Sequence, residues 1–331
     1  MKVLFIGGTG VISTACSRRA IDVGIDLYVL NRGNNNNKLP KEVKLLKGDY
    51  FNDQEVNELL KDHYFDAVVQ WIAFTKEHVE RDYRILKGKT SQYIFISSAS
   101  AYVKPLPFLP ITEEMPLGNK YWEYSDNKRI CEEYLNKLND DTFNITNVRP
   151  SHTYDDTKIV LQMKSWVAPY TMLDRMLKGK KIILPDGGSS KWTLTHNSDF
   201  AMSFVDILGN KQAYGESYHI TSDKVYTWKE ITESIYKALD ITPNTISIPT
   251  EFILKMRPYL TGEFLGDKSN DLVFDNSKIK ALSPNYSSKV DYDNIVKKAV
   301  AYNLDNKHVQ NIDNEYNKQY DEIILAYKRD Y

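Results

Sequence analysis

The stretch Val3-Leu4-Phe5-Ile6-Gly7-Gly8-Thr9-Gly10-Val11-Ile12-Ser13 decides the fold of this 331-residue chain. Its four apolar residues predict a buried strand, and the glycines that follow predict a tight turn that opens a helix. Glycines at such a turn let the backbone approach a pyrophosphate, and the helix N-terminus supplies N–H donors and a positive dipole. The sequence therefore predicts a dinucleotide-binding turn, whose contacts we assign to Gly7, Thr9, Gly10, Val11 and Ile12.

The rest of the first half alternates short apolar runs with amphipathic stretches, which is typical of βαβ units around a parallel sheet. Strands are predicted at residues 3–6, 27–30, 43–46, 67–70, 93–97 and 144–148. Helices are predicted at residues 11–23, 53–61, 76–86 and 121–138. We therefore expect an α/β fold, namely a Rossmann-type doubly wound parallel sheet.

Beyond about residue 150 the alternation loosens into isolated elements. Strands are predicted near residues 217–221 and 245–248, and a helix is predicted near residues 228–239. We expect residues 1–155 to form an NAD(P)-binding Rossmann domain. Residues 156–331 are expected to form mainly a smaller α/β substrate lobe, with segments that cross back between the two.

The composition restricts the partners of the protein. The chain has 43 Lys and Arg against 44 Asp and Glu, and this balance argues against nucleic acid, which requires a basic surface. No apolar stretch approaches the ~20 residues that span a bilayer. The two cysteines cannot form a disulfide framework, and no cluster has metal-ligand spacing. We expect a soluble, cytoplasmic protein with a small-molecule substrate, no membrane partner and no metal.

The residues after the second and third predicted strands bear on the cofactor. An acidic residue after the second strand would bind the ribose hydroxyls and repel a 2′-phosphate. This chain has Asn31 and then Arg32, a cation that can pair with that phosphate, although a solvated loop arginine is the alternative. The pair favours NADP over NAD. Asp49, followed by Tyr50, could accept a hydrogen bond from the adenine amino group or could serve as a helix N-terminal carboxylate.

Tyr124 and Lys128 are separated by one helical turn, so their side chains share a face. A neighbouring ammonium lowers the pKa of a phenol, which makes tyrosine usable as an acid or base. In a chain with 23 tyrosines this spacing alone is weak evidence. The serines at residues 97–100 strengthen it, because they follow a predicted strand and Ser98 could donate to the same substrate oxygen. A polar loop or a helix cap is the alternative role for these serines.

Together with Arg149-Pro150-Ser151-His152-Thr153-Tyr154, these motifs resemble the extended short-chain dehydrogenase/reductases of the NAD-dependent epimerase/dehydratase superfamily. The resemblance covers roughly residues 1–300. It implies that Tyr124 is the general acid or base, that Lys128 holds the nicotinamide ribose, and that Ser98 polarises the substrate oxygen. It also implies three residues near the cofactor: Ala73, Pro150 and His152.

The chain departs from the family pattern in its substrate motifs. Family dehydratases carry an Asp-Glu pair where this chain has Ala99-Ser100, which argues against 4,6-dehydration. Nucleotide-sugar epimerases grip the diphosphate with two arginines, and the matching segments at 189–193 and 264–267 contain none. Lys191 and Lys268 could replace the charge but not the bidentate fork. By resemblance, the candidate substrate contacts are Ser98, Lys191, Trp192 and His196, with core or hinge roles as the alternative for the tryptophan and histidine.

The leading hypothesis is an NAD(P)-dependent oxidoreductase or epimerase that moves a hydride to or from a hydroxyl-bearing carbon of a sugar or nucleotide sugar. Arg32 favours a reductase, and the family's association with sugars favours an epimerase. The alternative is a non-catalytic dinucleotide- or RNA-binding protein on the same fold, against which the retained Tyr124 and Lys128 argue. By analogy with relatives, the helices at residues 76–86 and 121–138 are expected to form a homodimer interface.

Overall fold

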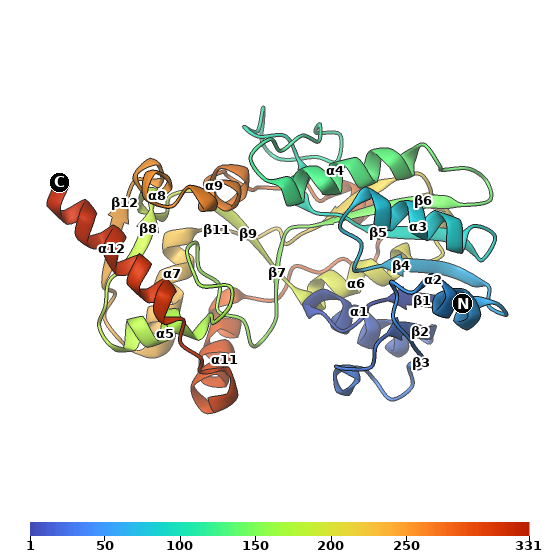
Figure 1. Ribbon diagram of the computed structural model, residues 1–331, viewed down its shortest axis with the longest axis horizontal. Coiled ribbons are helices and arrows are strands. Elements are labelled where there is room, and N and C mark those ends of the chain that lie inside the picture. The colour runs from blue at the N-terminus through green and yellow to red at the C-terminus, as the bar shows by residue number, and fades with distance from the viewer. Residues whose placement is uncertain (331) are drawn as a thin grey trace.

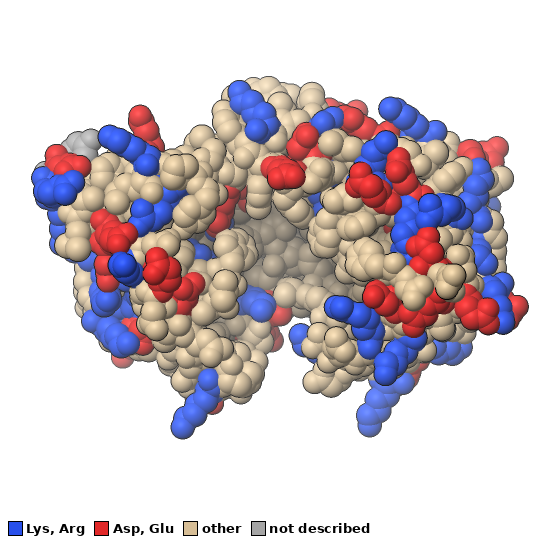
Figure 2. Space-filling view, viewed as in Figure 1, with Lys and Arg blue, Asp and Glu red and all other residues tan. Residues whose placement is uncertain are grey.

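The computed structural model describes residues 1–330. Its two lobes lie side by side in Figure 1, with the N-terminus at the right and the C-terminal helix at the left. A space-filling view from the same side shows a hollow between the lobes, surrounded mainly by uncharged residues (Figure 2). The site described below lies where these lobes meet.

The right-hand lobe is built on a seven-stranded sheet with the order β10-β6-β5-β4-β1-β2-β3, in which all neighbouring strands are parallel. All six strands predicted in the first half are confirmed, with shifts of at most three residues at their ends. The seven strands are β1 (Lys2–Ile6), β2 (Asp26–Asn31), β3 (Lys44–Lys47), β4 (Phe65–Gln70), β5 (Thr90–Ile96), β6 (Asn144–Pro150) and β10 (Ser217–Ile220).

Helices cover both faces of this sheet, which confirms the doubly wound prediction (Figure 1). Along β1, Val3 and Phe5 pack on one face, and Leu4 and Ile6 pack on the other. This alternation explains why the strand is apolar throughout: a parallel sheet covered on both sides has no polar face. One face is covered by α1 (Val11–Asp22), α6 (Asn197–Ile207) and α10 (Ser277–Leu282), and the other by α2 (Asp53–Leu60), α3 (Lys76–Leu86) and α4 (Glu123–Asn136).

Two elements after residue 155 return to the first sheet. Strand β10 pairs with β6 in parallel, with Tyr218 opposite Val148, and α6 packs beside α1. The strand expected near residues 217–221 therefore exists, and its partner is the Rossmann sheet. This pairing covers the edge of β6, whose backbone groups would otherwise be unpaired.

The second lobe has its own core, built around Trp192, Trp228 and Tyr320. Helix α12 packs on this lobe, where the Tyr320 hydroxyl accepts a hydrogen bond from the backbone N–H of Ile183 at 2.7 Å. The lobe expected to end at residue 331 thus extends at least through residue 330, since residue 331 lies outside the described residues. Its strands are β7 (His152–Tyr154), β8 (Ile182–Pro185), β9 (Lys191–His196), β11 (Val225–Thr227) and β12 (Thr245–Ile248), and its helices are α5 (Tyr170–Leu177), α7 (Trp228–Leu239), α8 (Thr250–Met256), α9 (Thr261–Glu263), α11 (Tyr292–Asp305) and α12 (Asn314–Asp330).

Two properties of residues 1–330 bear on membranes and metals. None of the helices in this range is both long enough and apolar enough to cross a membrane. Within the same range, no group of three or more His, Cys, Asp or Glu side chains could hold a metal ion. Cys16 and Cys131 are buried free thiols on α1 and α4.

Candidate active site

The turn between β1 and α1 shapes the centre of the site. Gly7 and Gly8 have φ angles of +104° and +91°, which side chains rarely allow. A Cβ atom on Gly8 would lie 2.9 Å from Val29, so both conformation and space require glycine there. The hydroxyl of Ser13 accepts a hydrogen bond from the Gly10 N–H at 2.8 Å and caps α1. The turn thus brings the open N-terminus of α1 to the carboxyl end of the sheet, which suits a phosphate group.

Two cavities meet at this turn and share Gly7, Thr9 and Ile72 in their walls. A cavity of about 220 Å³ extends toward the ends of β2 and β3, and one of about 420 Å³ extends toward α4. An elongated cleft with a helix N-terminus at its middle fits a dinucleotide, whose pyrophosphate joins two nucleosides.

The smaller cavity contains the residues predicted to hold adenosine. Asn31 accepts a hydrogen bond from the Gly33 N–H at 2.7 Å, and this bond shapes the loop after β2. Arg32 is exposed, and within residues 1–330 its guanidinium makes no hydrogen bond or ion pair. Asp49 is exposed and accepts from the Phe51 N–H at 3.0 Å. Tyr50 is buried, and its hydroxyl accepts from Gln70 at 2.8 Å, so packing is its visible role.

The larger cavity brings together Tyr124, Lys128 and Ser98. Helix α4 presents the tyrosine and lysine on one face, and the end of β5 supplies the serine. The ammonium of Lys128 donates to the carbonyl oxygens of Ala73 at 2.7 Å and Ile96 at 2.8 Å. It lies 5.9 Å from the centroid of the Tyr124 ring. Ala73 is fully buried, and its backbone oxygen is its contact with the Lys128 ammonium.

The pKa shift of Tyr124 beside Lys128 differs from the one expected from the sequence. Burial raises the pKa of Tyr124, and the negative charge of Asp267 adds to this rise, while a hydrogen bond with Ser98 opposes it. Burial also lowers the pKa of Lys128 to about 8. The expected lowering of the tyrosine pKa by the lysine is therefore wrong for the protein alone, because desolvation of the phenolate is the larger effect.

A chain of hydroxyl groups extends behind Ser98. The Ser98 and Ser100 hydroxyls are 2.8 Å apart, and Ser125 donates to the Ser100 hydroxyl at 2.7 Å. Ser98 also caps the short turn that follows β5 by accepting from the Ser100 N–H. Ser98 can therefore cap this turn and also contribute its hydroxyl to the cavity. Ser125 was missed by sequence reasoning, although it directly follows Tyr124.

A third cavity, of about 390 Å³, adjoins Tyr124 on the side of the second lobe. Trp192 lines this cavity, as does His152, whose ring meets the indole edge-on at 5.9 Å between centroids. His152 thus faces the predicted substrate side, whereas Pro150 lines both cavities. Burial holds the pKa of His152 well below its usual range, so its imidazole is neutral. Trp122, Trp166 and Asp267 also line this cavity, and sequence reasoning gave them no role.

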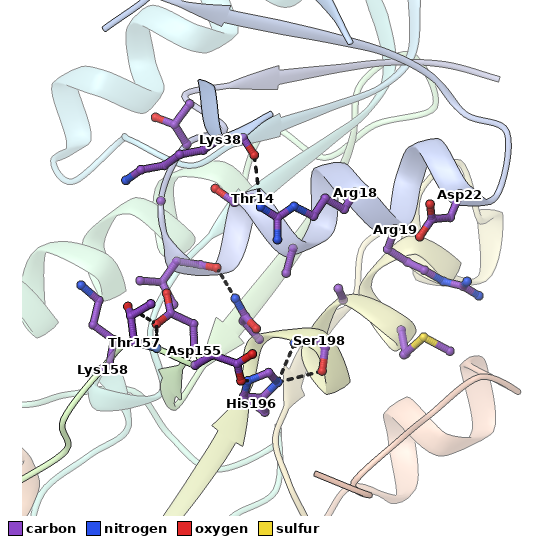
Figure 3. A pocket seen from close by; sticks show the side chains of 18 of the residues that line it. Thr14, Arg18, Arg19, Asp22, Lys38, Asp155, Thr157, Lys158, His196 and Ser198 are labelled. Atoms are coloured by element: carbon purple, nitrogen blue, oxygen red, sulfur yellow. Dashed lines mark hydrogen bonds and ion pairs between the residues drawn. The ribbon is translucent and has the colours of Figure 1, made fainter. Parts of the chain in front are cut away.

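Two predicted substrate residues lie elsewhere. Lys191 is exposed at the start of β9, where its N–H donates to Asp271 at 2.7 Å, and it lines none of these cavities. His196 lies in a cavity of about 660 Å³ on the other side of the α1 N-terminus (Figure 3). There its ring accepts from the Ser198 N–H and caps α6, with Asp156 at 3.2 Å. The structure therefore does not bring these two residues to Tyr124.

Arg149, from the motif after the sixth predicted strand, lines none of the cavities described above. It forms a buried ion pair with Glu132 at 2.7 Å and donates to the Tyr102 hydroxyl at 3.2 Å. This pair ties β6 to α4, and α4 carries Tyr124. The motif thus contributes Pro150 to the cavity and Arg149 to the support behind it.

A doubly wound sheet, a glycine turn and a Tyr-Lys pair on the fourth helix define an extended short-chain dehydrogenase/reductase. The chain belongs to the NAD dependent epimerase/dehydratase family, whose profile matches residues 3–221. It is 25% identical over 298 residues to 2′-dehydrokanamycin reductase of Streptomyces kanamyceticus, which covers 87% of this chain and 81% of the relative. It is 28% identical over 250 residues to the chloroplast stem-loop binding protein of 41 kDa b of Arabidopsis thaliana, which covers 72% of this chain and 63% of that protein.

Solved structures share the fold across nearly the whole chain. An epimerase of Methanothermobacter thermautotrophicus superposes with a TM-score of 0.74 at 15% identity, covering 93% of this chain and 94% of that one. UDP-glucose 4-epimerase from Bifidobacterium longum, solved with NAD+ and UDP, superposes with a TM-score of 0.72 at 18% identity. That match covers 92% of this chain and 99% of the epimerase.

Proposed function

We propose that this chain is an NAD(P)-dependent oxidoreductase or epimerase that acts on a hydroxyl-bearing carbon of a sugar-like small molecule. The observation that carries the proposal is the convergence of Tyr124, Ser98 and Lys128 in one cavity that continues into the glycine turn. A bound nicotinamide would supply or accept the hydride. The residues of the turn would hold its pyrophosphate, and Lys128 would hold its ribose.

Tyr124 would move the proton of the reacting hydroxyl group. In reduction, its phenol would donate the proton to the carbonyl oxygen as the C–O double bond becomes a single bond, and Ser98 would donate a hydrogen bond to the same oxygen. The raised pKa of Tyr124 keeps the phenol protonated at neutral pH, which favours this direction. In oxidation the phenolate would accept that proton, and a nearby Lys128 ammonium would assist this state.

NADP is the cofactor we favour. Arg32 is exposed beside the adenosine cavity without a partner among the described residues, so its guanidinium is free to pair with a 2′-phosphate. Release of the cofactor after each turnover would make the protein a reductase, and retention of NAD would make it an epimerase. The similarity to a named reductase along 298 residues supports the first outcome. Ala99 and Ser100, in place of the acidic pair, argue against dehydration.

Mass spectrometry of the nucleotides that co-purify with the protein would separate reductase from epimerase. Retained NAD supports an epimerase, and an empty site that accepts NADPH supports a reductase. Tyr124→Phe tests the chemistry, because it removes the hydroxyl and leaves the ring. We expect turnover to fall by about 10²–10⁴-fold while dinucleotide binding persists. Tyr134→Phe, on the same helix but remote from the cavities, is the matched control and should retain turnover. Unchanged turnover in Tyr124→Phe would exclude Tyr124 from the mechanism.

Similarity to the Arabidopsis stem-loop binding protein makes RNA binding a second candidate. Phosphate contacts need Lys and Arg gathered on one surface. On the face in Figure 2, Lys and Arg are interspersed with Asp and Glu over both lobes and do not gather into one basic surface, which favours a small-molecule site. A gel shift with structured RNA that weakens steeply with salt would support RNA binding. Absence of a shift at low salt would exclude it.

We also propose a homodimer formed through α3 and α4, which pack side by side on one face of the sheet. Sedimentation equilibrium would test it, and a monomer at micromolar concentration would exclude it.

A further inference from the structure

The cavity beside Tyr124 on the second-lobe side has an uneven chemical lining. Three tryptophans form much of its wall, namely Trp122, Trp166 and Trp192. Among the described residues that line it, Asp267 is the only one with an acidic side chain, and none is a lysine. The His152 imidazole is neutral. None of these described lining residues is an arginine. The cavity is therefore aromatic with a single acidic group.

Asp267 is held in this position by the backbone. It lies in a widened helical turn, Phe264–Lys268, whose Gly266 carbonyl accepts a hydrogen bond from the Asn119 side chain at 2.6 Å. The same Asn119 amide donates to the Ser100 carbonyl at 2.8 Å. This amide links the turn of Asp267 to the segment that carries Ser98. The distance between the carboxylate and the reacting hydroxyl groups is thus set by the fold.

The Asp267 carboxylate is not paired with another side chain among the described residues. Within residues 1–330 it makes no side-chain hydrogen bond and no ion pair within 4 Å. Lys268 is the adjacent cation, but it pairs with Glu263 and donates to the Gln162 carbonyl at 2.7 Å. Lys104 is buried nearby and donates to the Tyr102 carbonyl at 3.3 Å. Both cations reduce the cost of an ionised Asp267 without contacting it, yet burial still raises its pKa to about 7.

A half-buried carboxylate in a cavity lined by three tryptophans suits a cation. Indole rings attract ammonium groups by about 0.5–2 kcal/mol, and more where water is excluded. A carboxylate adds a charge-assisted hydrogen bond. A diphosphate would place its negative charge in the same cavity, against Asp267 and without an arginine fork. The lining thus favours an amine over the diphosphate of a nucleotide sugar.

We propose that this cavity binds the ammonium group of a polyhydroxylated ring compound, such as an amino sugar or an aminocyclitol, with Asp267 as its counter-ion. The inference rests on the proposed function, because it places the amine next to the hydroxyl group that Tyr124 serves. Asp267 is then the residue that sets substrate specificity, and the three tryptophans supply aromatic surface for the ammonium group.

Binding of neamine, a two-ring aminocyclitol, to the dinucleotide-saturated protein tests the inference. Tryptophan fluorescence and calorimetry would compare it with fully N-acetylated neamine, which has the same rings without the charges. We expect the free amine to bind at least about tenfold more tightly, a difference of about 1.4 kcal/mol. Asp267→Asn should abolish that preference. Asp271→Asn, which keeps an acceptor for the Lys191 N–H outside the cavity, should retain it.

Two results would overturn the inference. One is that neamine binds no more tightly than its acetylated form, or does not saturate at millimolar concentration. The other is that UDP-glucose binds more tightly than neamine and loses affinity in Asp267→Asn, which would make the carboxylate an acceptor for ribose hydroxyls. Because binding requires no turnover, the same titration on Tyr124→Phe separates this inference from the redox proposal. Neamine binding by the wild-type protein that turns over no compound would refute the proposed function alone.

Discussion

Replacing Glu132 with Gln should destabilise the protein more than any surface charge change on the same helix. Glu132 is 1% exposed, and its carboxylate accepts three hydrogen bonds from Arg149, at 2.7, 3.0 and 3.2 Å. The guanidinium stays charged in any folded state, so the variant leaves it buried opposite a neutral amide. Breaking a buried pair from one side costs about 3–5 kcal/mol, and we expect the lower end because Gln keeps one acceptor.

Urea denaturation, followed by circular dichroism, would measure this loss as a fall in the transition midpoint. Glu133→Gln is the matched control: its partner is Arg129, the Glu133 side chain is 54% exposed, and such pairs contribute about 0–1 kcal/mol. Adding Arg149→Met to Glu132→Gln should restore part of the stability, because the unpaired charge is gone. Equal midpoints for the two glutamate variants would refute the assignment of the Glu132–Arg149 pair as the anchor of α4.

Three further predictions concern pH, cofactor and backbone. Burial raises the pKa of Asp82 to about 8, so the folded protein holds a proton that the unfolded chain releases. Stability should therefore fall as pH rises from about 4 toward 8, by up to about 1.4 kcal/mol per unit, and Asp82→Asn should flatten this slope in thermal melts. Arg32→Ala should weaken NADPH binding about tenfold and leave NADH unchanged in fluorescence titrations, and equal losses would contradict the phosphate contact. Gly8→Ala should lower the denaturation midpoint well beyond Gly24→Ala, because both glycines have positive φ but a Cβ atom at Gly24 meets open space; similar midpoints would contradict the steric reason.

The Rossmann sheet could be predicted because its signal is local. Each strand is an apolar run, and each crossover helix has its own apolar stripe, as the match at residues 76–86 shows. The partner of β10 could not be predicted in this way. Its sequence indicates a strand, but pairing with β6 depends on a chain that leaves the sheet for some sixty residues and then returns. Short strands such as β7 and β11, with three residues each, lack a periodic signal.

The candidate site shows the same difference between local signals and contacts between distant segments. Residues on one helix, such as Tyr124 and Lys128, could be placed together because their spacing fixes their common face. Lys191 and His196 belong to one strand, yet each lies at an end of it, so a motif-level match could not say that neither of them faces Tyr124. Asp267 reaches the cavity through a widened turn and the Asn119 bridge, and neither feature has a signature in the sequence.

The separation between the Tyr124 ring and the Lys128 ammonium has a physical cause that also explains how the pair would work. Two backbone carbonyls at the ends of neighbouring strands hold the ammonium, and these contacts oppose the cost of burying its charge. A ribose hydroxyl in the cleft would add an acceptor for the third N–H of this ammonium, which stabilises the charged form without moving it. The phenol, in contrast, is governed by burial and by its bond with Ser98. The sheet therefore holds the lysine where it could bind the cofactor ribose. The pKa of Tyr124 depends more on burial, Ser98 and Asp267 than on the spacing of the pair.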